Sequence, residues 1–310
     1  MKLIQNTING LRYKHWTMLE AFAYFLRGIA YKLKIAPDFF LEFYKNVTCK
    51  AFKKRWLKKN EKGESYFDFN GSIIPDISAD KNNFYLFIKL MFEDVFFIPC
   101  FYNDNFDKSV VESLVHYVES PYSYKDGAFD VTIKKGDVVI DAGAWIGDFS
   151  AYAVYKGAVT YAFEPTEDNY NLLCKTNDLN KGKIYPIKKG LGSKECELSI
   201  TINKEHTASN SFVMKGKTTA VEERIKVTTL DKFVEENNLK QIDFIKADIE
   251  GAEREMLRGA VNTLKTFAPK LTICTYHLPD DREVLEKLIL EINPCYKIVH
   301  LPDKLFATII

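Results

Sequence analysis

From residue 137 onward, short apolar runs typical of β-strands alternate with stretches of helical periodicity. The strand patterns cover residues 137–141, 159–163, 183–188, 242–247 and 270–275. The helical patterns cover residues 146–155, 167–177, 230–237, 250–258 and 281–291. This alternation predicts an α/β fold with a parallel sheet covered on both faces and a ligand crevice at the carboxyl ends of its strands. A strand hairpin is predicted at residues 196–202 and 224–228, and a closing strand pair at 295–300 and 305–310.

The turn after the first of these strands carries the most specific signal. Residues 136–148 read Gly-Asp-Val-Val-Ile-Asp-Ala-Gly-Ala-Trp-Ile-Gly-Asp. Asp141 ends the apolar run, and Gly143 and Gly147 allow a tight turn and close approach of the backbone to a bound molecule. A dinucleotide fingerprint has the spacing G-x-G-x-x-G, but Trp145 stands where its second glycine would be. The turn therefore favours S-adenosylmethionine over NAD, because an acid suits a cationic amino acid better than a pyrophosphate.

A second carboxylate follows the next predicted strand. Glu164 stands 23 positions after Asp141, directly behind residues 159–163. In nucleotide-binding folds, an acid about 20 residues after the glycine turn accepts hydrogen bonds from ribose hydroxyls. The predicted cofactor-binding residues are therefore Asp141, Gly143, Gly147 and Glu164. The alternative is that the two acids only cap helices or occupy turns.

Charge is distributed unevenly along the 310 residues. Residues 1–60 contain 13 basic and 3 acidic residues, whereas the remainder contains 30 basic and 39 acidic residues. An amphipathic helix is predicted from Trp16 to Leu33, and after Pro37 an aromatic-rich helix from about Phe39 to Lys59 carries a basic cluster. This basic face is either a solvated surface or a membrane-docking face. Nucleic-acid binding is disfavoured, because no recognised binding motif accompanies the charge.

Residues 1–120 are predicted to form a smaller, mainly helical region before a sheet-forming domain at residues 121–310. Within the first region, strands flank the hairpin-type dipeptide Asn70-Gly71. Helical patterns cover residues 82–92 and 108–119, and a strand pattern covers residues 95–102. Acceptor shaping, dimerisation and membrane-surface docking are all open as roles of this region.

Composition narrows the class of protein further. Apolar residues make up 46% of the chain, as in globular proteins, and the six cysteines show no zinc-finger or disulfide spacing. The sequence does not open with a signal-peptide pattern, and no uncharged apolar stretch approaches the roughly 20 residues that span a bilayer. We expect a cytoplasmic protein, with peripheral contact to the inner face of the membrane as an open alternative.

A second distinctive block follows the strand at residues 242–247. It contains Asp248-Ile249-Glu250-Gly251 and continues to Leu257-Arg258-Gly259-Ala260, and Tyr276-His277 follows the next strand. With the Gly136–Ala144 turn, these blocks make residues 120–300 similar to the FkbM family of S-adenosylmethionine-dependent methyltransferases. The resemblance implies a Rossmann-like, seven-stranded methyltransferase domain. It also implies methyl transfer to a hydroxyl group, usually of a sugar or another natural product.

Methyl transfer to an alcohol requires a group that takes up the hydroxyl proton, because alcohols hold little anion at neutral pH. Asp248 and His277 are predicted at the ends of neighbouring strands, and either is a candidate base. Glu250 is a third catalytic candidate, with a helix-terminal role as the alternative. Tyr122 or Tyr124 is predicted to close over the cofactor, or else to anchor the linker. A divalent metal held by Asp248, Glu250 and His277 is left undecided.

The sequence thus predicts an S-adenosylmethionine-dependent O-methyltransferase that acts on a carbohydrate or small-molecule hydroxyl, as in a surface glycan precursor. Two alternatives remain. An NAD-dependent sugar-modifying enzyme is disfavoured by the missing fingerprint glycine. A non-catalytic adaptor would keep the fold and bind glycan or membrane. The oligomeric state is open, and a homo-oligomer is compatible with each alternative.

Overall fold

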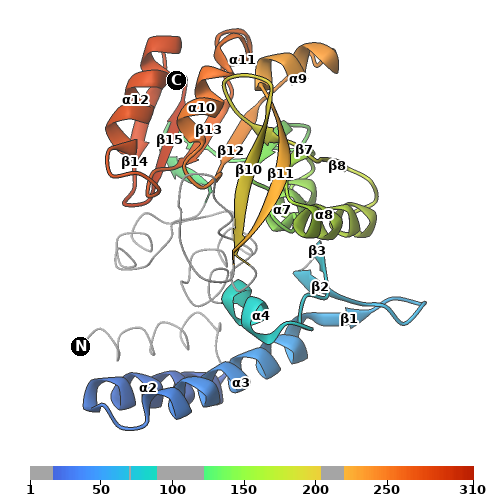
Figure 1. Ribbon diagram of the computed structural model, residues 1–310, viewed down its shortest axis with the longest axis vertical. Coiled ribbons are helices and arrows are strands. Elements are labelled where there is room, and N and C mark those ends of the chain that lie inside the picture. Colours follow the sequence, from blue (N-terminus) through green and yellow to red (C-terminus); the bar gives the residue numbers. More distant parts are fainter. Residues whose placement is uncertain (1–16, 70, 89–121, 204–219) are drawn as a thin grey trace. The chain divides into compact units, whose positions relative to one another are not determined.

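The structure, a computed structural model, describes residues 17–69, 71–88, 122–203 and 220–310 (Figure 1). The chain folds into two compact units. The first comprises Met1–Asp68 and Asp76–Ile98, and the second comprises Phe69–Pro75 and Pro99–Ile310. The predicted domain boundary near residue 120 lies outside the described residues and stays a prediction.

The described part of the first unit is built mainly from helices. Helix α2 (Met18–Leu33) begins with a capping box, in which the side chains of Thr17 and Glu20 each accept a hydrogen bond from the other's backbone amide. Helix α3 (Pro37–Trp56) begins with a proline, whose fixed φ suits the first helical turn. Helix α4 spans Lys81–Ile88. No helix in the described part of the chain combines the length and the apolar character needed to cross a bilayer.

The prediction that the second helix continues to about Lys59 is wrong. Helix α3 ends at Trp56, and β1 (Leu57–Lys59) pairs antiparallel with β2 (Ser65–Phe69), so that Leu57 lies opposite the buried Phe67. Cross-strand pairing therefore overrides the helical pattern at these three residues.

Strands on both sides of Asn70-Gly71 are confirmed, since β2 precedes this dipeptide and β3 (Ser72–Pro75) follows it. Asn70 itself lies outside the described residues. So do residues 89–92 of the helix predicted at 82–92, the strand predicted at 95–102 and the helix predicted at 108–119.

The second unit is built on a seven-stranded sheet with the order β14-β15-β13-β12-β6-β7-β8. Its strands are β6 (Val138–Ala142), β7 (Val159–Phe163), β8 (Ile184–Ile187), β12 (Phe244–Ala247), β13 (Lys270–Cys274), β14 (Lys297–His300) and β15 (Lys304–Thr308). Five strands from β13 to β8 run parallel, and β15 is antiparallel to both β13 and β14. The predicted Rossmann-like seven-stranded fold and its closing strand pair are confirmed.

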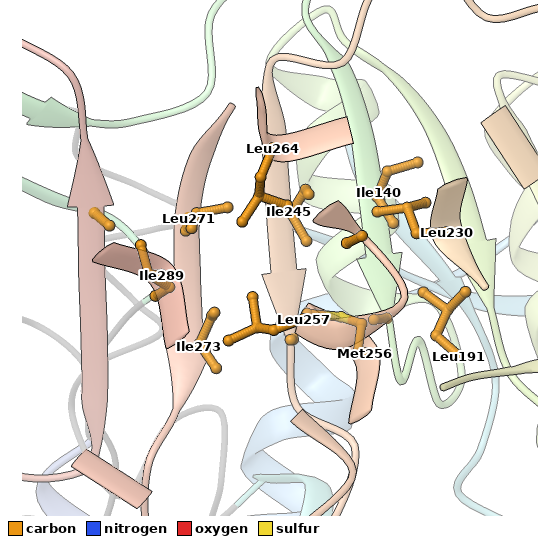
Figure 2. Close-up of a cluster of buried hydrophobic side chains, with 14 of the residues drawn as sticks. Ile140, Leu191, Leu230, Ile245, Met256, Leu257, Leu264, Leu271, Ile273 and Ile289 are labelled. Carbon is orange, nitrogen blue, oxygen red and sulfur yellow. The ribbon is translucent and has the colours of Figure 1, made fainter. Parts of the chain in front are cut away.

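Helices accompany this sheet in the second unit (Figure 1). They are α7 (Asp148–Tyr155), α8 (Glu167–Leu179), α9 (Leu230–Glu236), α10 (Glu253–Arg258), α11 (Val261–Phe267) and α12 (Asp281–Ile292). Figure 2 shows Leu257, Leu264 and Ile289 from the last three helices packed with Ile245 and Leu271 of the central strands. The central strands are largely apolar, as in parallel sheets buried on both faces, with Asp141 of β6 and Lys246 of β12 as buried charged exceptions.

Two smaller sheets complete the second unit. Strands β10 (Cys196–Asn203) and β11 (Ala220–Thr228) form the predicted hairpin, and β9 (Gly190–Leu191) pairs in parallel with β11. Strands β4 (Tyr124–Asp126) and β5 (Phe129–Val131) form a short antiparallel pair.

Candidate active site

A pocket lies at the carboxyl ends of β6, β7 and β12, where parallel α/β sheets bind ligands. It encloses about 610 Å³ of space, part of which is open to solvent. The polar and backbone groups that line it include Gly143, Trp145, Glu164, Thr166, Asp248 and Glu250. Four residues predicted for the site, Gly143, Glu164, Asp248 and Glu250, therefore meet at one pocket.

The two glycines of the turn have separate packing roles. Gly143 has a φ of +76°, and a Cβ at this position would lie 1.9 Å from the carbonyl oxygen of Asp248. Only glycine therefore allows the ends of β6 and β12 to approach this closely beside the pocket. Gly147 has a φ of +83°, and a Cβ there would lie 2.7 Å from Leu173 of α8. Gly147 is not among the described residues that line the pocket, so its contact with a cofactor stays a prediction.

Trp145 adopts the backbone conformation that the absent fingerprint glycine would favour. Its φ is +48°, in the left-handed region. In this conformation its backbone N–H donates a hydrogen bond of 3.0 Å to Oε2 of Glu164. The turn after β6 and the end of β7 are joined at the pocket by this bond.

Glu164 is a buried carboxylate that can accept more hydrogen bonds than it does in the described structure. Oε1 accepts hydrogen bonds from the Thr166 backbone at 3.0 Å and the Thr166 hydroxyl at 2.5 Å, with the Asn169 amide at 3.5 Å. Oε2 accepts the Trp145 N–H, which leaves acceptor capacity directed to the pocket. Burial raises the pKa of Glu164, and the hydrogen bonds from Thr166, Trp145 and Asn169 oppose that shift.

Asp141 lies at the end of β6 but does not line the pocket in the described structure. It is fully buried and accepts a hydrogen bond of 2.6 Å from the Ser150 hydroxyl. Lys246 Nζ lies 3.0 Å from its Oδ1 and donates at 2.6 Å to the Gly143 carbonyl. Asp141 is therefore the carboxylate partner of the buried Lys246. Direct contact between Asp141 and a cofactor stays a prediction.

Asp248 is the central acid of the site. Its Oδ2 accepts a hydrogen bond of 2.5 Å from the Tyr122 hydroxyl, and its Oδ1 accepts one of 3.2 Å from the Tyr276 hydroxyl. Burial alone would raise the pKa of Asp248, but the positive charges of Lys246, His277 and Lys304 hold it below its usual value. Asp248 is therefore an ionised carboxylate at the pocket wall.

His277 follows β13, the strand next to β12, as the sequence predicted. Its Nδ1 lies 3.1 Å from Glu253 Oε1, and its Nε2 lies 3.6 Å from both Asp248 Oδ1 and Glu250 Oε2. Burial alone would lower the pKa of His277, but Glu253, Asp248 and Glu250 raise it to about 9. His277 is not among the residues that line the pocket.

A tight turn after β12 brings Glu250 to this histidine. Glu250 has a φ of +55° and Gly251 a φ of +99°, so two consecutive residues are left-handed. The fully buried Glu253 holds the turn, because its carboxylate accepts the backbone N–H groups of Ile249 at 2.8 Å and Gly251 at 3.0 Å. The structure thus brings Asp248, Glu250 and His277 together, which the sequence left undecided.

The comparison with known families decides what kind of protein carries this site. A family model described as "Methyltransferase FkbM domain" matches residues 141–297, which contain the end of β6, the strands β7 and β12, and the site acids Asp141, Glu164, Asp248 and Glu250. The chain belongs to the FkbM methyltransferase family.

Relatives that are named as methyltransferases match part of the chain. Hexuronic acid methyltransferase AglP of Haloferax volcanii is 29% identical over 163 residues, covering 51% of this chain and 63% of the relative. Methyltransferase 1 of Beauveria bassiana is 27% identical over 156 residues, covering 43% and 63%. The matches thus span less than two thirds of these two relatives. A crystal structure of an FkbM methyltransferase from Methylobacillus flagellatus is 23% identical, with a TM-score of 0.48 and coverage of 74% of this chain and 55% of that one.

Tyr122 and Glu253 have roles at this site that the sequence did not assign. Tyr122, rather than Tyr124, contacts Asp248, and its ring lies 4.5 Å from the Lys304 ammonium group. Tyr124 packs instead against Phe129 and Phe306. The structural role of Glu253 was also missed, although it stands in the same block as Asp248. The sequence did offer a signal for Glu253, because it stands three residues after Glu250 in the first turn of the helix predicted at residues 250–258.

Proposed function

We propose that this FkbM protein transfers a methyl group from S-adenosylmethionine to a hydroxyl oxygen of a sugar. The observation that carries the proposal is that Glu164 and Asp248, at the ends of β7 and β12, line the same pocket. The carboxylate of Glu164 is suited to the hydroxyls of a ribose, and that of Asp248 to the hydroxyl of an acceptor. A concave pocket with apolar side chains and a few polar groups is typical of small-molecule and cofactor sites.

The residues present fit a nucleoside methyl donor. Glu164 has acceptor capacity for ribose hydroxyls, and Phe163, Leu191 and Ile200 supply apolar surface for a base. Gly143 keeps side chains away from the backbone beside the pocket. Asp141 supports this arrangement indirectly, by fixing the turn through Ser150 and Lys246.

S-adenosylmethionine supplies an electrophilic methyl group, so the protein must align the acceptor oxygen and receive its proton. Asp248 is the catalytic candidate, because it lines the pocket and its carboxylate is held in place by Tyr122 and Tyr276. His277 is a positioning residue in this proposal, because it reaches Asp248 and Glu250 but does not line the pocket.

A sugar acceptor is supported by the relative from Haloferax volcanii, whose name describes hexuronic acid methylation. The test is incubation of the protein with methyl-labelled S-adenosylmethionine and a panel of uronic acids, neutral sugars and sugar nucleotides. Mass spectrometry should find the added methyl group on a hydroxyl oxygen of one of these acceptor classes, and the Asp248→Asn variant should not form this product. Failure to bind S-adenosylmethionine in calorimetry, together with no product, would refute the proposal.

We further propose peripheral contact of the helical unit with an anionic membrane. Leu19, Phe22, Leu33 and Phe39 are each more than half exposed, and the exposed Lys32 and Lys34 lie beside Leu33. Apolar side chains flanked by lysines are typical of helices that lie on anionic lipid. The full chain should sediment with phosphatidylserine vesicles at low salt, and Phe22→Ser/Leu33→Ser should not. Equal sedimentation of both proteins, or a dimer that buries the same residues, would argue against membrane contact.

A further inference from the structure

We propose that Asp248, Glu250 and His277 bind a divalent first-row metal ion. One ligand atom from each residue lies within 4.8 Å of the others. The ligand atoms are Oδ1 of Asp248, Oε2 of Glu250 and Nε2 of His277, and the histidine nitrogen lies 3.6 Å from each oxygen. Two carboxylate oxygens and one imidazole nitrogen suit ions such as Mn²⁺, Co²⁺ and Zn²⁺.

The histidine gives independent support for an ion. Its side chain is 4% exposed, neither ring nitrogen has a hydrogen-bond partner, and Nε2 lies 3.6 Å from the carboxylate oxygens of Asp248 and Glu250. A buried ring nitrogen without a partner carries a desolvation cost that a bound ion would remove. The 3.6 Å separations exceed a hydrogen bond but fit two ligands that share one ion with bonds of about 2.1 Å.

Glu253 orients this histidine as carboxylates do around metal sites. Its Oε1 lies 3.1 Å from His277 Nδ1, on the opposite side of the ring from Asp248 and Glu250. A carboxylate at Nδ1 favours a proton there and directs the lone pair of Nε2 towards an ion. Glu253 is itself fixed, because it is fully buried and accepts two backbone N–H groups.

A second cluster of Glu253, His277 and Asp281 is less suited to an ion. Asp281 already accepts hydrogen bonds from Arg254 Nε at 2.8 Å and from the Leu278 backbone at 2.7 Å. The Glu253 carboxylate already accepts hydrogen bonds from the backbone N–H groups of Ile249 and Gly251. The ion therefore belongs on the Nε2 side of His277.

The proposed metal site adjoins the pocket, which gives a bound ion a role in the reaction. Asp248 and Glu250 both line the pocket, so an ion between them would adjoin an acceptor hydroxyl. Divalent ions lower the pKa of a coordinated oxygen, which is the assistance that methyl transfer to an alcohol requires. This use rests on the proposed function, whereas binding of the ion does not.

The test measures metal binding without S-adenosylmethionine or acceptor. Metal-free full-length protein is titrated with Mn²⁺, and free Mn²⁺ is followed by electron paramagnetic resonance. We expect one bound ion per chain, and binding weakened about 100-fold or more by Glu250→Gln or His277→Gln. The Glu250→Gln variant keeps the size and shape of the side chain, which is 16% exposed, so circular dichroism should show it folded. Co²⁺ should give a visible spectrum that His277→Gln changes.

Glu286→Gln is the matched control, because it removes a carboxylate that lies 2.6 Å from another histidine, His300, in a pair without a third ligand in the described structure. It should bind Mn²⁺ as the wild type does. As much free Mn²⁺ with wild type as with Glu250→Gln would overturn the metal site. That result would leave methyl transfer standing if labelled product still forms, so the two proposals fail separately.

Discussion

The ammonium group of Lys246 lies 3.0 Å from the carboxylate of Asp141, and both side chains are buried. The two residues face each other in the register of β12 and β6. Burial alone would lower the pKa of Lys246, but Asp141, Asp248 and Asp148 raise it, so the lysine stays charged. Since Lys246 also binds the Gly143 carbonyl, this ion pair holds the turn that forms the pocket wall.

The first prediction concerns this ion pair. Lys246→Met leaves the Asp141 carboxylate buried without its cation, and we expect a loss of about 3–5 kcal/mol in the free energy of unfolding. Urea unfolding followed by circular dichroism measures the loss. Adding Asp141→Asn to the variant should recover much of it, because the uncompensated charge is then removed.

Lys287→Met is the matched control for that prediction. Lys287 pairs with Glu291 at 3.7 Å, but its side chain is 76% exposed, so the change should cost about 1 kcal/mol or less. Equal losses for Lys246→Met and Lys287→Met would show that the buried pair contributes no more than a surface pair.

The second prediction separates two effects of Gly143. Gly143→Ala places a Cβ against the Asp248 carbonyl at a φ of +76°. Gly136→Ala also meets a positive φ, +90°, but has no atom within 4 Å of the added Cβ. The control should lose about 1–2 kcal/mol from backbone strain, and Gly143→Ala should lose about 2 kcal/mol more from overpacking. Similar melting temperatures for the two variants would contradict the close approach of β6 and β12.

Local pattern was sufficient to predict the sheet. The strands from β6 to β13 are short apolar runs bounded by turn residues, so their type and approximate ends follow from sequence. The end of α3 was misplaced and α11 was not predicted, because partners distant in sequence decide both. Leu57 pairs with Phe67 across strands, and Leu264 of α11 joins the core of the second unit.

The sequence predicted which residues lie near the site more readily than it predicted which groups their side chains contact. The order of the blocks placed Asp248 and His277 on neighbouring strands, which the register confirms. Sequence does not show which carboxylates a buried lysine will neutralise, and Asp141 faces Lys246 rather than the pocket lining. The convergence of Glu250 on His277 depends on two left-handed residues in succession, and Glu250 is not a residue type that signals this conformation.

The third prediction tests the proposed ribose acceptor. Glu164→Gln replaces one carboxylate oxygen with an NH2 group, so the hydrogen bonds from Trp145 to Oε2 and from Thr166 to Oε1 cannot both be kept. Affinity for S-adenosylmethionine should fall about 10-fold to 100-fold, as for loss of a charge-assisted hydrogen bond. Calorimetry measures it, with Glu291→Gln on the exposed face of α12 as the control. Unchanged affinity in a folded Glu164→Gln protein would place the ribose elsewhere.

The fourth prediction is a pH dependence of stability at Asp148. Burial raises the pKa of Asp148 to about 7, with Asp141 adding to the shift and Lys246 opposing it. Since the unfolded carboxyl has a pKa of about 3.9, the unfolded state loses its proton first as pH rises. Stability should therefore fall between about pH 4 and pH 7, by roughly 4 kcal/mol in total, and then level off.

Asp148→Asn removes this titration without changing the size of the side chain. The variant should match the wild type near pH 4 and exceed its unfolding free energy near pH 8, in urea titrations at each pH. A difference between the two proteins that stays constant from pH 4 to pH 8 would contradict a raised pKa at this position.

The fifth prediction assigns the proton-accepting step and distinguishes the two tyrosines. Asp248→Asn should lower kcat about 100-fold or more and leave S-adenosylmethionine affinity nearly unchanged, because in the proposed reaction Asp248 receives the proton of the acceptor hydroxyl and Glu164 binds the cofactor. Tyr122→Phe removes the hydroxyl that donates to Oδ2 at 2.5 Å but keeps the ring beside Lys304, so kcat should fall by a smaller factor. Tyr124→Phe should leave kcat unchanged, since Tyr124 packs against Phe129 and Phe306. If Tyr124→Phe lowers turnover more than Tyr122→Phe, Tyr124 is the tyrosine that serves the site, and Asp248 is positioned by other groups.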